Sequence, residues 1–358
     1  MLRIIGGLLI FIFVGCKSEW DPYEGKGISR FGISEKHYDI ESYKVLNDEV
    51  NLDSIIMPSR ILAAENYLLI SDQQGPYLIH IIDMVSKKYL GGRIPRGEGP
   101  HEQLYVWDLG FNESNEVFFM DIIKRQFLKF DLDSLVSLEE ETDLKPRVKT
   151  KLSSDVNPIS LYNSENKNYY IDIDNGSARY YAEIENENKV NGYGSLLNKK
   201  TEFISDNFSA QLCEARITLL NNLVFISYLN APLIEIYNKK GEMVDAFLGP
   251  DYFVPIYAGF SDAENESYVP IIGSTVNGYY DIESSTNYVY ALYDGKVEQE
   301  TFDENGNKLF VVIDKGGKLD RTISISKGVF DFTVYNDETI YGINLASETP
   351  EIVSFKIN

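Results

Sequence analysis

Two short basic segments contain the side chains best suited to bind an anion. Arg96 lies in a glycine-rich run, and Lys124 and Arg125 follow a strongly apolar stretch. A guanidinium group pairs with both oxygens of a flat anion. If the two arginines and the lysine converge, they could therefore bind a carboxylate or a sulfated sugar. The competing interpretation is that Arg96 pairs with Glu98 or Glu102 and fixes its own loop. The candidate ligand-binding residues are Arg96, Glu98, His101, Glu102, Lys124 and Arg125.

Other patterns that resemble chemical sites favour structural roles. Residues 172–176 (DIDNG) begin like a calcium loop but lack the third spaced oxygen ligand and the later glutamate, so a tight turn is expected there and again at residues 303–307. The tyrosine pairs 180–181 and 279–280 could stack on sugar rings, although packing between sheets is the more common role of such aromatics. No GxSxG elbow, Walker loop or convincing pair of acids stands out, so no catalytic residue is assigned.

Metal and cofactor sites are not indicated. The histidines are His37, His80 and His101, and neither HxxxH nor CxxC spacing occurs, which argues against zinc. Cys213, in the segment AQLCEA (residues 210–215), is the one cysteine besides Cys16, and a buried structural thiol is favoured there over a nucleophile. We therefore expect no metal and no cofactor.

The amino-terminal residues have the pattern of an export signal. Arg3 precedes an apolar run, residues 4–14, which is shorter than the roughly 20 residues of a membrane-spanning helix. The tetrapeptide ending at Cys16 (FVGC) resembles a lipobox, so Cys16 is the expected lipidation site; the alternative is an ordinary secreted protein with an incidental cysteine. Lys17 stands where an aspartate would resemble an inner-membrane retention signal, which favours the outer membrane, on either its periplasmic or its surface face.

The composition of the chain indicates which partners, secondary structure and domain organisation to expect. The formal net charge of -22 repels polyanions, so nucleic acid is not an expected partner. The abundance of aromatic residues, 25 Tyr and 19 Phe, favours strands over helices. No linker-like segment interrupts the body, so the expected organisation is a signal peptide over residues 1–15, a lipidated cysteine and polar tether over 16–36, and one domain over 37–358.

A repeated pair of apolar strands predicts the architecture. Six copies occur, and the first strand of each pair ends near residues 72, 121, 172, 227, 292 and 343, so the copies are spaced by about 50 residues. That period, with two clear strands and weaker flanking ones, is typical of four-stranded propeller blades. We expect an all-β, six-bladed β-propeller. Because the sixth copy ends at the carboxyl terminus, residues 37–45 are expected to supply its outer strand and close the ring.

The run that contains Arg96 also carries a family resemblance. Its Gly-x-Gly-Pro-x-Glu pattern resembles the connection between blades in the TolB-like and NHL-like six-bladed propeller lipoproteins of Gram-negative bacteria. In a propeller such connections and the turns between second and third strands open on one face, which would bring Arg96 near Lys124 and Arg125. The matching residues are Arg96, Gly97, Gly99, Pro100 and Glu102, while Gln103-Leu104 replaces the usual aromatic.

The expected function is that of a membrane-anchored, extracytoplasmic binding or interaction protein. Members of the resembled families are mostly binding and scaffold proteins, so a glycan, a peptide or an envelope protein is the expected partner, besides the membrane that holds Cys16. One alternative is a propeller hydrolase or lyase acting on a polysaccharide or lactone, with acidic or histidine side chains converging on the axis. Another is a structural subunit of an envelope complex, since fold alone does not decide function.

Overall fold

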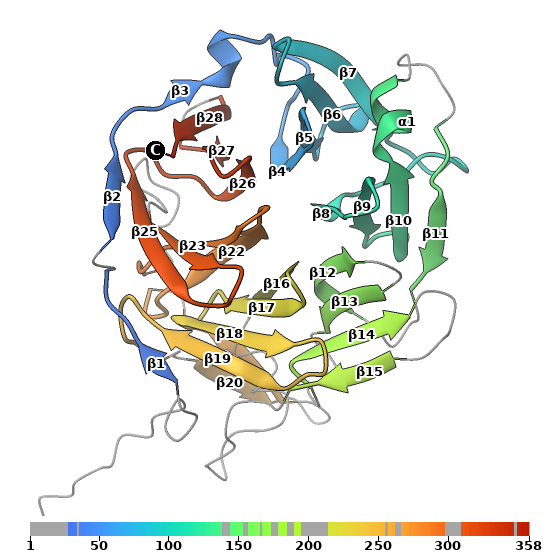
Figure 1. Ribbon diagram of the computed structural model, residues 1–358. Coiled ribbons are helices and arrows are strands. Elements are labelled where there is room, and N and C mark those ends of the chain that lie inside the picture. The colour runs from blue at the N-terminus through green and yellow to red at the C-terminus, as the bar shows by residue number, and fades with distance from the viewer. Residues whose placement is uncertain are drawn as a thin grey trace, which may run out of the picture.

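The chain forms six antiparallel sheets around a central axis, as Figure 1 shows. The computed structural model describes residues 28–33, 36–137, 144–152, 157–164, 167–172, 178–184, 190–194, 214–254, 257–261, 266–271, 273–297, 309–346 and 349–357. Cys16, Cys213 and the residues 173–177 and 301–308 therefore lie outside the described part. The repeats predicted this six-bladed β-propeller, and the prediction is confirmed.

The first three blades follow one another along the chain, each from the axis outward. Blade 1 contains β4 (Pro58–Ala64), β5 (Tyr67–Asp72), β6 (Tyr77–Asp83) and β7 (Lys88–Pro95). Blade 2 contains β8 (Trp107–Phe111), β9 (Glu116–Asp121), β10 (Gln126–Asp131) and β11 (Val148–Lys151), with the helix α1 (Leu132–Ser137) before β11. Blade 3 contains β12 (Pro158–Ser164), β13 (Lys167–Asp172), β14 (Tyr180–Ile184) and β15 (Val190–Tyr193).

The last three blades are each completed or extended by a strand from the amino-terminal segment. Blade 4 contains β16 (Ala215–Leu220), β17 (Leu223–Tyr228), β18 (Leu233–Asn238) and β19 (Met243–Leu248). Blade 5 contains β22 (Tyr279–Ser284), β23 (Tyr288–Tyr293), β24 (Leu309–Asp314) and β25 (Leu319–Ile325). Blade 6 contains β26 (Asp331–Tyr335), β27 (Thr339–Asn344), β28 (Glu351–Lys356) and β3 (Lys44–Val45). Along the chain, the hairpin of β20 (Tyr257–Ser261) and β21 (Glu266–Pro270) is inserted between the strands of blades 4 and 5, and it accounts for the longest repeat spacing.

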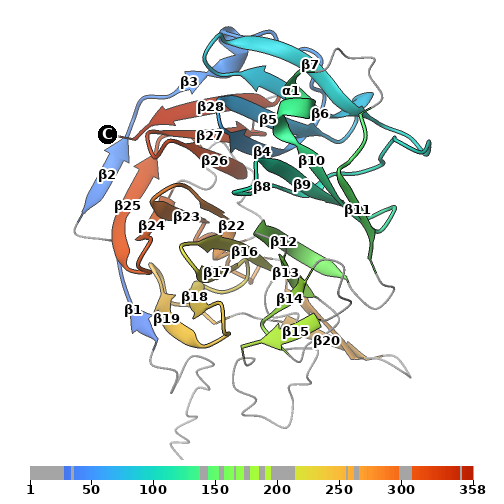
Figure 2. The same cartoon turned by 45° about the vertical axis from the view of Figure 1, so that its right-hand side comes forward.

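The amino-terminal segment runs along the outer edges of blades 4, 5 and 6 (Figures 1 and 2). β1 (Ser29–Arg30) pairs in parallel with β19, and β2 (His37–Ile40) pairs in parallel with β25. β3 then pairs antiparallel with β28, before the short 3-10 helix η1 (Leu46–Asp48). Ring closure by residues 37–45 agrees with this arrangement, although only Lys44 and Val45 of that segment join blade 6. The earlier residues cover the edge of blade 5 instead.

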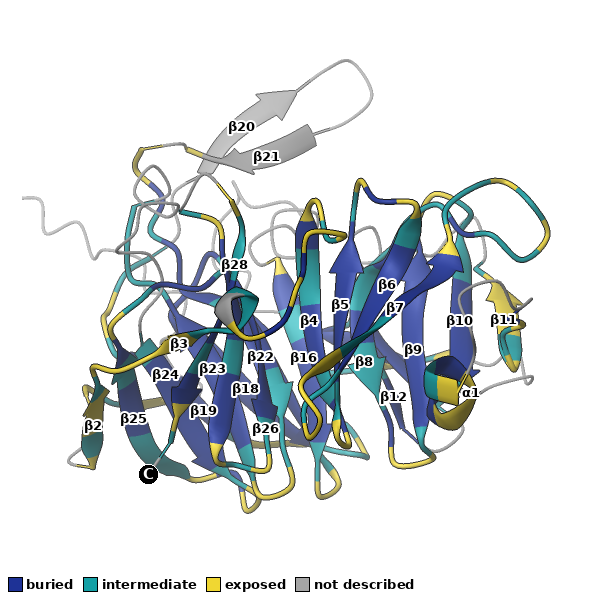
Figure 3. Ribbon diagram, turned by 90° about the horizontal axis from the view of Figure 1, so that it is seen from above, coloured by how far each residue is buried: buried dark blue, intermediate teal, exposed yellow. Residues whose placement is uncertain are grey.

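The core lies between the blades, because each sheet buries both faces against its neighbours. Six separate apolar clusters occupy the six interfaces between adjacent blades. The second strands are buried along almost their whole length, and in β9 all of Glu116–Asp121 is buried, as Figure 3 shows by colour. Tyr180 and Tyr279 are fully buried and Tyr181 nearly so, which agrees with packing rather than with sugar stacking.

An aspartate at the end of the second strand fixes the incoming connection in blades 1 and 2. The Asp72 carboxylate accepts backbone N–H bonds from Ile56, Met57 and Gln74 at 2.8–2.9 Å. Asp121 accepts the corresponding bond from Leu104 at 2.7 Å. The recurring Asp at the end of these strands is thus a structural acceptor for backbone groups that the sheet leaves unpaired.

Candidate functional site

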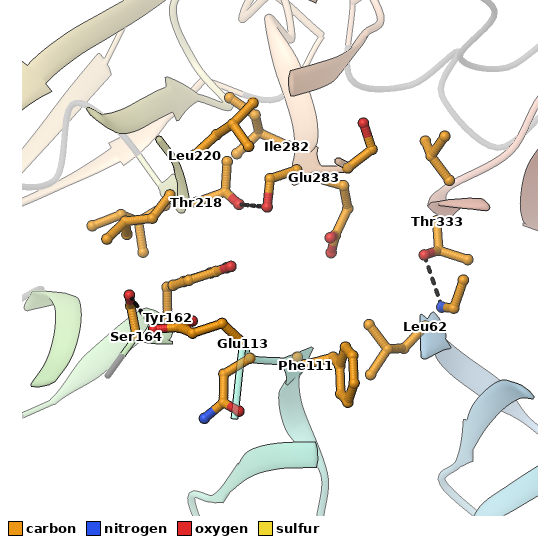
Figure 4. A pocket seen from close by; sticks show the side chains of 18 of the residues that line it. Leu62, Phe111, Glu113, Tyr162, Ser164, Thr218, Leu220, Ile282, Glu283 and Thr333 are labelled. Atoms are coloured by element: carbon orange, nitrogen blue, oxygen red, sulfur yellow. Dashed lines mark hydrogen bonds between the residues drawn. The ribbon is translucent and has the colours of Figure 1, made fainter. Parts of the chain in front are cut away.

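The inner strands of all six blades surround a central cavity of about 630 Å³. Figure 4 shows side chains from these strands pointing into it, among them Glu283 and Tyr162. The cavity extends to the turns that follow the inner strands, where Glu65, Glu113 and Asn336 belong to its lining. It therefore reaches the face of the propeller on which the inner strands end.

One side chain from each inner strand forms a ring around the axis, which we call the polar ring. In blades 1, 3 and 5 the pairing of the inner strand shifts immediately before the ring residue, and in blade 2 the shift spans it. Such bulges redirect a side chain, here at the same level of successive blades. The polar ring consists of Arg60, Asp108, Ser160, Arg216, Asp281 and Asp331.

The polar ring joins neighbouring blades by bonding to their inner-strand backbones. Asp331 Oδ1 accepts the N–H of Ile61 at 2.9 Å, which links blade 6 to blade 1. Asp108 Oδ2 likewise accepts the N–H of Leu161 in blade 3. Ser160 Oγ accepts the N–H of Ile217 at 3.1 Å, which links blade 3 to blade 4. These side chains supply the acceptors that the inward edge of an inner strand lacks.

The two arginines of the polar ring have unequal partners. Arg60 Nη1 lies 2.7 Å from Asp331 Oδ2, a buried ion pair beyond the lining of the cavity. Arg216 lines the cavity and donates through Nη1 to the carbonyl of Ile159 at 3.1 Å, while its buried Nε finds no partner among the described residues. Burial and the nearby charge of Arg60 lower the pKa of Arg216. Both guanidinium groups lie 5.8 Å from the centre of the Trp107 ring.

Asp281 and Glu283 have few hydrogen-bond partners in the described part of the chain. Asp281 is 6% exposed, and its hydrogen bond is with the N–H of the next residue, Ile282, at 2.9 Å. The Glu283 carboxyl, two residues further along β22, makes no hydrogen bond or ion pair within the described part of the chain. Burial raises the pKa of Asp281, against the opposing charges of Arg60 and Arg216.

Glu283 is further destabilised as an anion by its surroundings. Burial raises its pKa well above the usual value, and the negative charges of Asp281 and Asp331 add to that effect. Burial also raises the pKa of Asp331 to about 7, although Arg60 opposes the change. The cations of the described residues thus do not fully compensate the carboxyl groups at the centre of the cavity.

Hydroxyl groups complete the wall around Glu283. Thr218 donates to Ser284 Oγ at 3.1 Å, a contact drawn in Figure 4. Burial raises the pKa of Tyr162 to about 12, so its phenol remains a neutral hydrogen-bonding group. At the rim, Ser164 donates to Glu113 at 2.8 Å. Hydroxyls and carboxyls at such positions can hydrogen-bond a polar ligand, whereas three histidine, cysteine or acidic side chains close enough for a metal ion do not occur among the described residues.

The predicted ligand-binding residues lie at the opposite face, where the inner strands begin. Arg96 donates to the carbonyls of Gly75, Leu104 and Asp72 at 2.6–2.9 Å. Lys124 Nζ donates to the carbonyl of Glu102 at 2.7 Å, so the connection and the turn do meet.

The other predicted residues of this group surround the same loop. The Glu102 carboxylate accepts the N–H of Gly99 at 2.8 Å, and Arg125 donates to the side chain of Asn157 at 2.9 Å. Glu98 is exposed and His101 is part-buried. Arg96 therefore fixes the loop through carbonyl groups rather than through Glu98 or Glu102. A ligand-binding role for these residues stays a prediction.

The sequence analysis missed the polar ring and Glu283. A regular signal did exist, because a polar residue precedes the end of each second strand at a nearly constant distance. Arg60 precedes Asp72 by 12 residues, and Ser160 precedes Asp172 by 12. Aligning the six copies on that position would have collected the ring, whereas the short inner strands carry too few apolar residues to be noticed by themselves.

Comparison with known protein families shows which family this chain belongs to. The model of the TolB-like 6-blade propeller-like family matches residues 38–337. The chain belongs to the TolB-like propeller family. A search among proteins with curated functions found no sequence match.

Solved structures similar to this TolB-like propeller share its fold. An exported protein from Bacteroides fragilis NCTC 9343 is 12% identical with a TM-score of 0.52, covering 89% of this chain and 98% of that one. A member of the DUF4221 family from Bacteroides vulgatus is 8% identical with a TM-score of 0.52, covering 92% and 95%. A streptogramin B lyase is 13% identical with a TM-score of 0.49, covering 88% and 98%. At these identities the likeness concerns the fold.

Replacing Arg96 by alanine in this TolB-like propeller is expected to lower its stability. The change leaves three backbone carbonyls without their charged donor, which corresponds to about 2–4 kcal/mol. Chemical denaturation measures the loss, and Glu98→Gln in the same loop is the control that should change stability little. If Arg96→Ala left the unfolding free energy unchanged, the structural role of this guanidinium would be wrong.

Replacing Glu283 by glutamine is expected to stabilise the protein at neutral and higher pH. The folded state holds the Glu283 proton more tightly than the unfolded chain, so above the ordinary pKa of 4.5 the folded state binds more protons and its unfolding free energy falls as pH rises. Glutamine removes this loss and adds roughly 0.5–2 kcal/mol near pH 8, with little change near pH 4.

Urea denaturation between pH 4 and pH 8 provides the measurement. Glu113→Gln is the matched control, since it removes a carboxyl at the rim of the same cavity. Parallel pH profiles for Glu283→Gln and the unchanged protein would contradict the assignment of a raised pKa to Glu283.

Proposed function

We propose that this TolB-like propeller is a lipid-anchored, extracytoplasmic binding protein that takes a small polar ligand, a glycan unit or a short peptide, into its central cavity. The observation that carries the proposal is Glu283, a carboxyl group in the cavity wall without a partner in the described chain. A carboxyl group without a partner in the protein is free to accept hydrogen bonds from a ligand, and such bonds to a charged group are stronger than those between neutral groups.

The dimensions and lining of the cavity support the same proposal. A volume of about 630 Å³ lies within the usual range for small-molecule sites, roughly 300–1,000 Å³. Phe111 and Leu62 give the cavity wall apolar surface, and Thr218 and Tyr162 give it hydroxyl groups (Figure 4). Such a mixture suits a sugar ring or a peptide unit, which has both an apolar face and hydrogen-bonding groups.

The soluble body, residues 19–358, gives a direct test of binding. Panels of small glycans and short peptides are screened by thermal shift, and hits are measured by calorimetry. Leu220→Trp fills the cavity and is expected to weaken a hit by about tenfold or more. Val85→Trp, at a position that is 72% exposed on blade 1, is the matched control and should leave affinity unchanged. Silence across both panels, or a hit insensitive to Leu220→Trp, would count against the cavity as the binding site.

A hydrolase or lyase acting on a polysaccharide or lactone is the second candidate function. The observation in its favour is the convergence of Asp108, Asp281 and Glu283 on the axis, with the pKa of Asp281 and of Glu283 raised by burial. A carboxyl group that keeps its proton near neutral pH can act as a general acid. The calorimetric experiment separates the two functions, because an enzyme consumes its ligand and Glu283→Gln abolishes that turnover.

The membrane anchor is the remaining part of the proposal and rests on the lipobox-like sequence at Cys16. The described residues contain no helix with the length and apolar character needed to cross a membrane. Several acyl chains on one cysteine give a stable anchor, because each buried methylene contributes about 0.8 kcal/mol.

Replacing Cys16 by alanine is expected to release the protein from the membrane fraction. Palmitate labelling of the full chain in a Gram-negative host measures acylation, and fractionation measures its effect on localisation. Lys17→Ala serves as a control and should leave labelling intact. Equal labelling of Cys16→Ala and the unchanged chain would remove Cys16 as the acylated residue.

A further inference from the structure

The cavity wall has an excess of negative charge. Five acidic and two basic side chains line it. Two of the acids already have partners, since Asp108 accepts the N–H of Leu161 and Glu113 accepts the hydroxyl of Ser164. Of the other three acids, Glu65 is exposed in a turn at the rim, whereas Asp281 and Glu283 lie on the inner strand β22.

These two acids project from one strand towards the same space. They stand two residues apart on β22, and side chains with that spacing point to the same face of a strand. Asp281 is more than nine-tenths buried, and its second carboxylate oxygen accepts no hydrogen bond from the described chain. Glu283 has neither oxygen engaged. Two neighbouring carboxyl groups with free acceptor positions therefore face the cavity.

We infer that the ligand carries a primary ammonium group and that this group binds at Asp281 and Glu283. The inference rests on the proposed binding function and specifies the chemistry of the ligand. An ammonium ion presents three N–H donors around a compact positive charge, so it can bond two carboxylates and one hydroxyl at once. The hydroxyl of Tyr162 lies in the same wall and interacts electrostatically with Glu283. The ammonium belongs to an amino sugar or to the amino terminus of a peptide.

Other occupants fit the same wall less well. A metal site built by the protein alone usually gathers three or more close ligands, and the described residues provide no such group of acidic, histidine or cysteine side chains. A neutral hydroxyl donates one bond and leaves the charge of the pair unbalanced. An anionic ligand would meet repulsion from both acids, because Arg216 is the nearest lining cation and Arg60 is already paired with Asp331.

The titration behaviour of the site supports this chemistry. The pKa values of Asp281 and Glu283 are raised, by burial first, so the folded protein is short of positive charge at this point. Arg60, Arg216, Asp108, Asp331 and Tyr162 are the other titratable groups that act on the pair. An ammonium between the two acids would lower both pKa values, and its binding is accordingly expected to release protons.

Matched pairs of probes test the inference with the soluble body. Chitosan dimers and trimers are compared with their N-acetylated counterparts, and a trialanine peptide is compared with its N-acetylated form. Acetylation removes the charge but retains the rest of the molecule. The amine form of the sugar or of the peptide is expected to bind about 10- to 100-fold more tightly than its acetylated partner, the usual size of a charge-assisted hydrogen bond. The preferred arm identifies the source of the ammonium.

Variants locate the effect at the two acids. Glu283→Gln and Asp281→Asn keep the shape of the side chains and should each remove most of the preference for the amine. Glu113→Gln removes a charge from the rim and should keep it. Calorimetry in buffers of different ionisation enthalpy should also detect proton release by the unchanged protein and less of it by Glu283→Gln, a variant expected to fold even if Asp281→Asn does not.

The outcomes distinguish this inference from the proposed function. Binding of a neutral ligand that Leu220→Trp weakens, without preference for any amine, would overturn the ammonium site and leave the binding function in place. Amine binding that Glu283→Gln leaves unchanged would overturn the assignment to this pair. Failure of every amine probe to bind would overturn the inference as well.

Discussion

The inward edge of each inner strand is the constraint on which this structure depends. Every blade pairs its strands outward, so the innermost strand faces the axis with backbone N–H and C=O groups that no further strand can pair. Side chains supply the missing partners across three of the blade interfaces, through Asp331, Asp108 and Ser160. The polar ring is therefore a structural requirement before it is anything else.

That requirement also shapes the chemistry of the cavity. Two of the three acceptors placed for backbone N–H groups are carboxylates, and three of the six ring positions are aspartates. Arg60 compensates Asp331 directly, whereas Asp281 accepts no contact from a cation within salt-bridge distance in the described chain. Glu283, two residues further along β22, is a second acid beside Asp281 without a cation partner in that part of the chain. Because the fold uses carboxylates to pair the backbone N–H groups of its inner strands, acidic side chains outnumber basic ones in the central cavity.

Sequence predicted what repeats along the chain and missed what repeats around the axis. The second strands of the blades are buried on both faces, so runs such as Glu116–Asp121 are recognisable at once and fix the number of blades. The role of residues 37–45 followed from counting, since the sixth copy lacked an outer strand. The inner strands are different, because polar residues such as Arg60 and Asp281 face the channel and interrupt the apolar pattern.

The candidate loop illustrates a second limit of sequence reasoning. The loop that contains Arg96 and the turn that contains Lys124 meet, but the hydrogen bonds of both side chains go to backbone carbonyls, which carry no signature in the sequence. Composition can show that a cation is present in a loop. It cannot show whether the loop itself uses that cation, since this depends on the direction of carbonyl groups in three dimensions.

Under a pulling force, the amino-terminal strands would separate from the propeller in a fixed order. Tension on the chain ahead of Ile28 would act first on β1, which is held through two residue pairs, and next on β2, with four. β3, which completes blade 6, would come under load after both had peeled away. β1 and β2 would therefore detach before β3 under such a force, and the pairing of β3 with β28 that completes blade 6 would be the last to break.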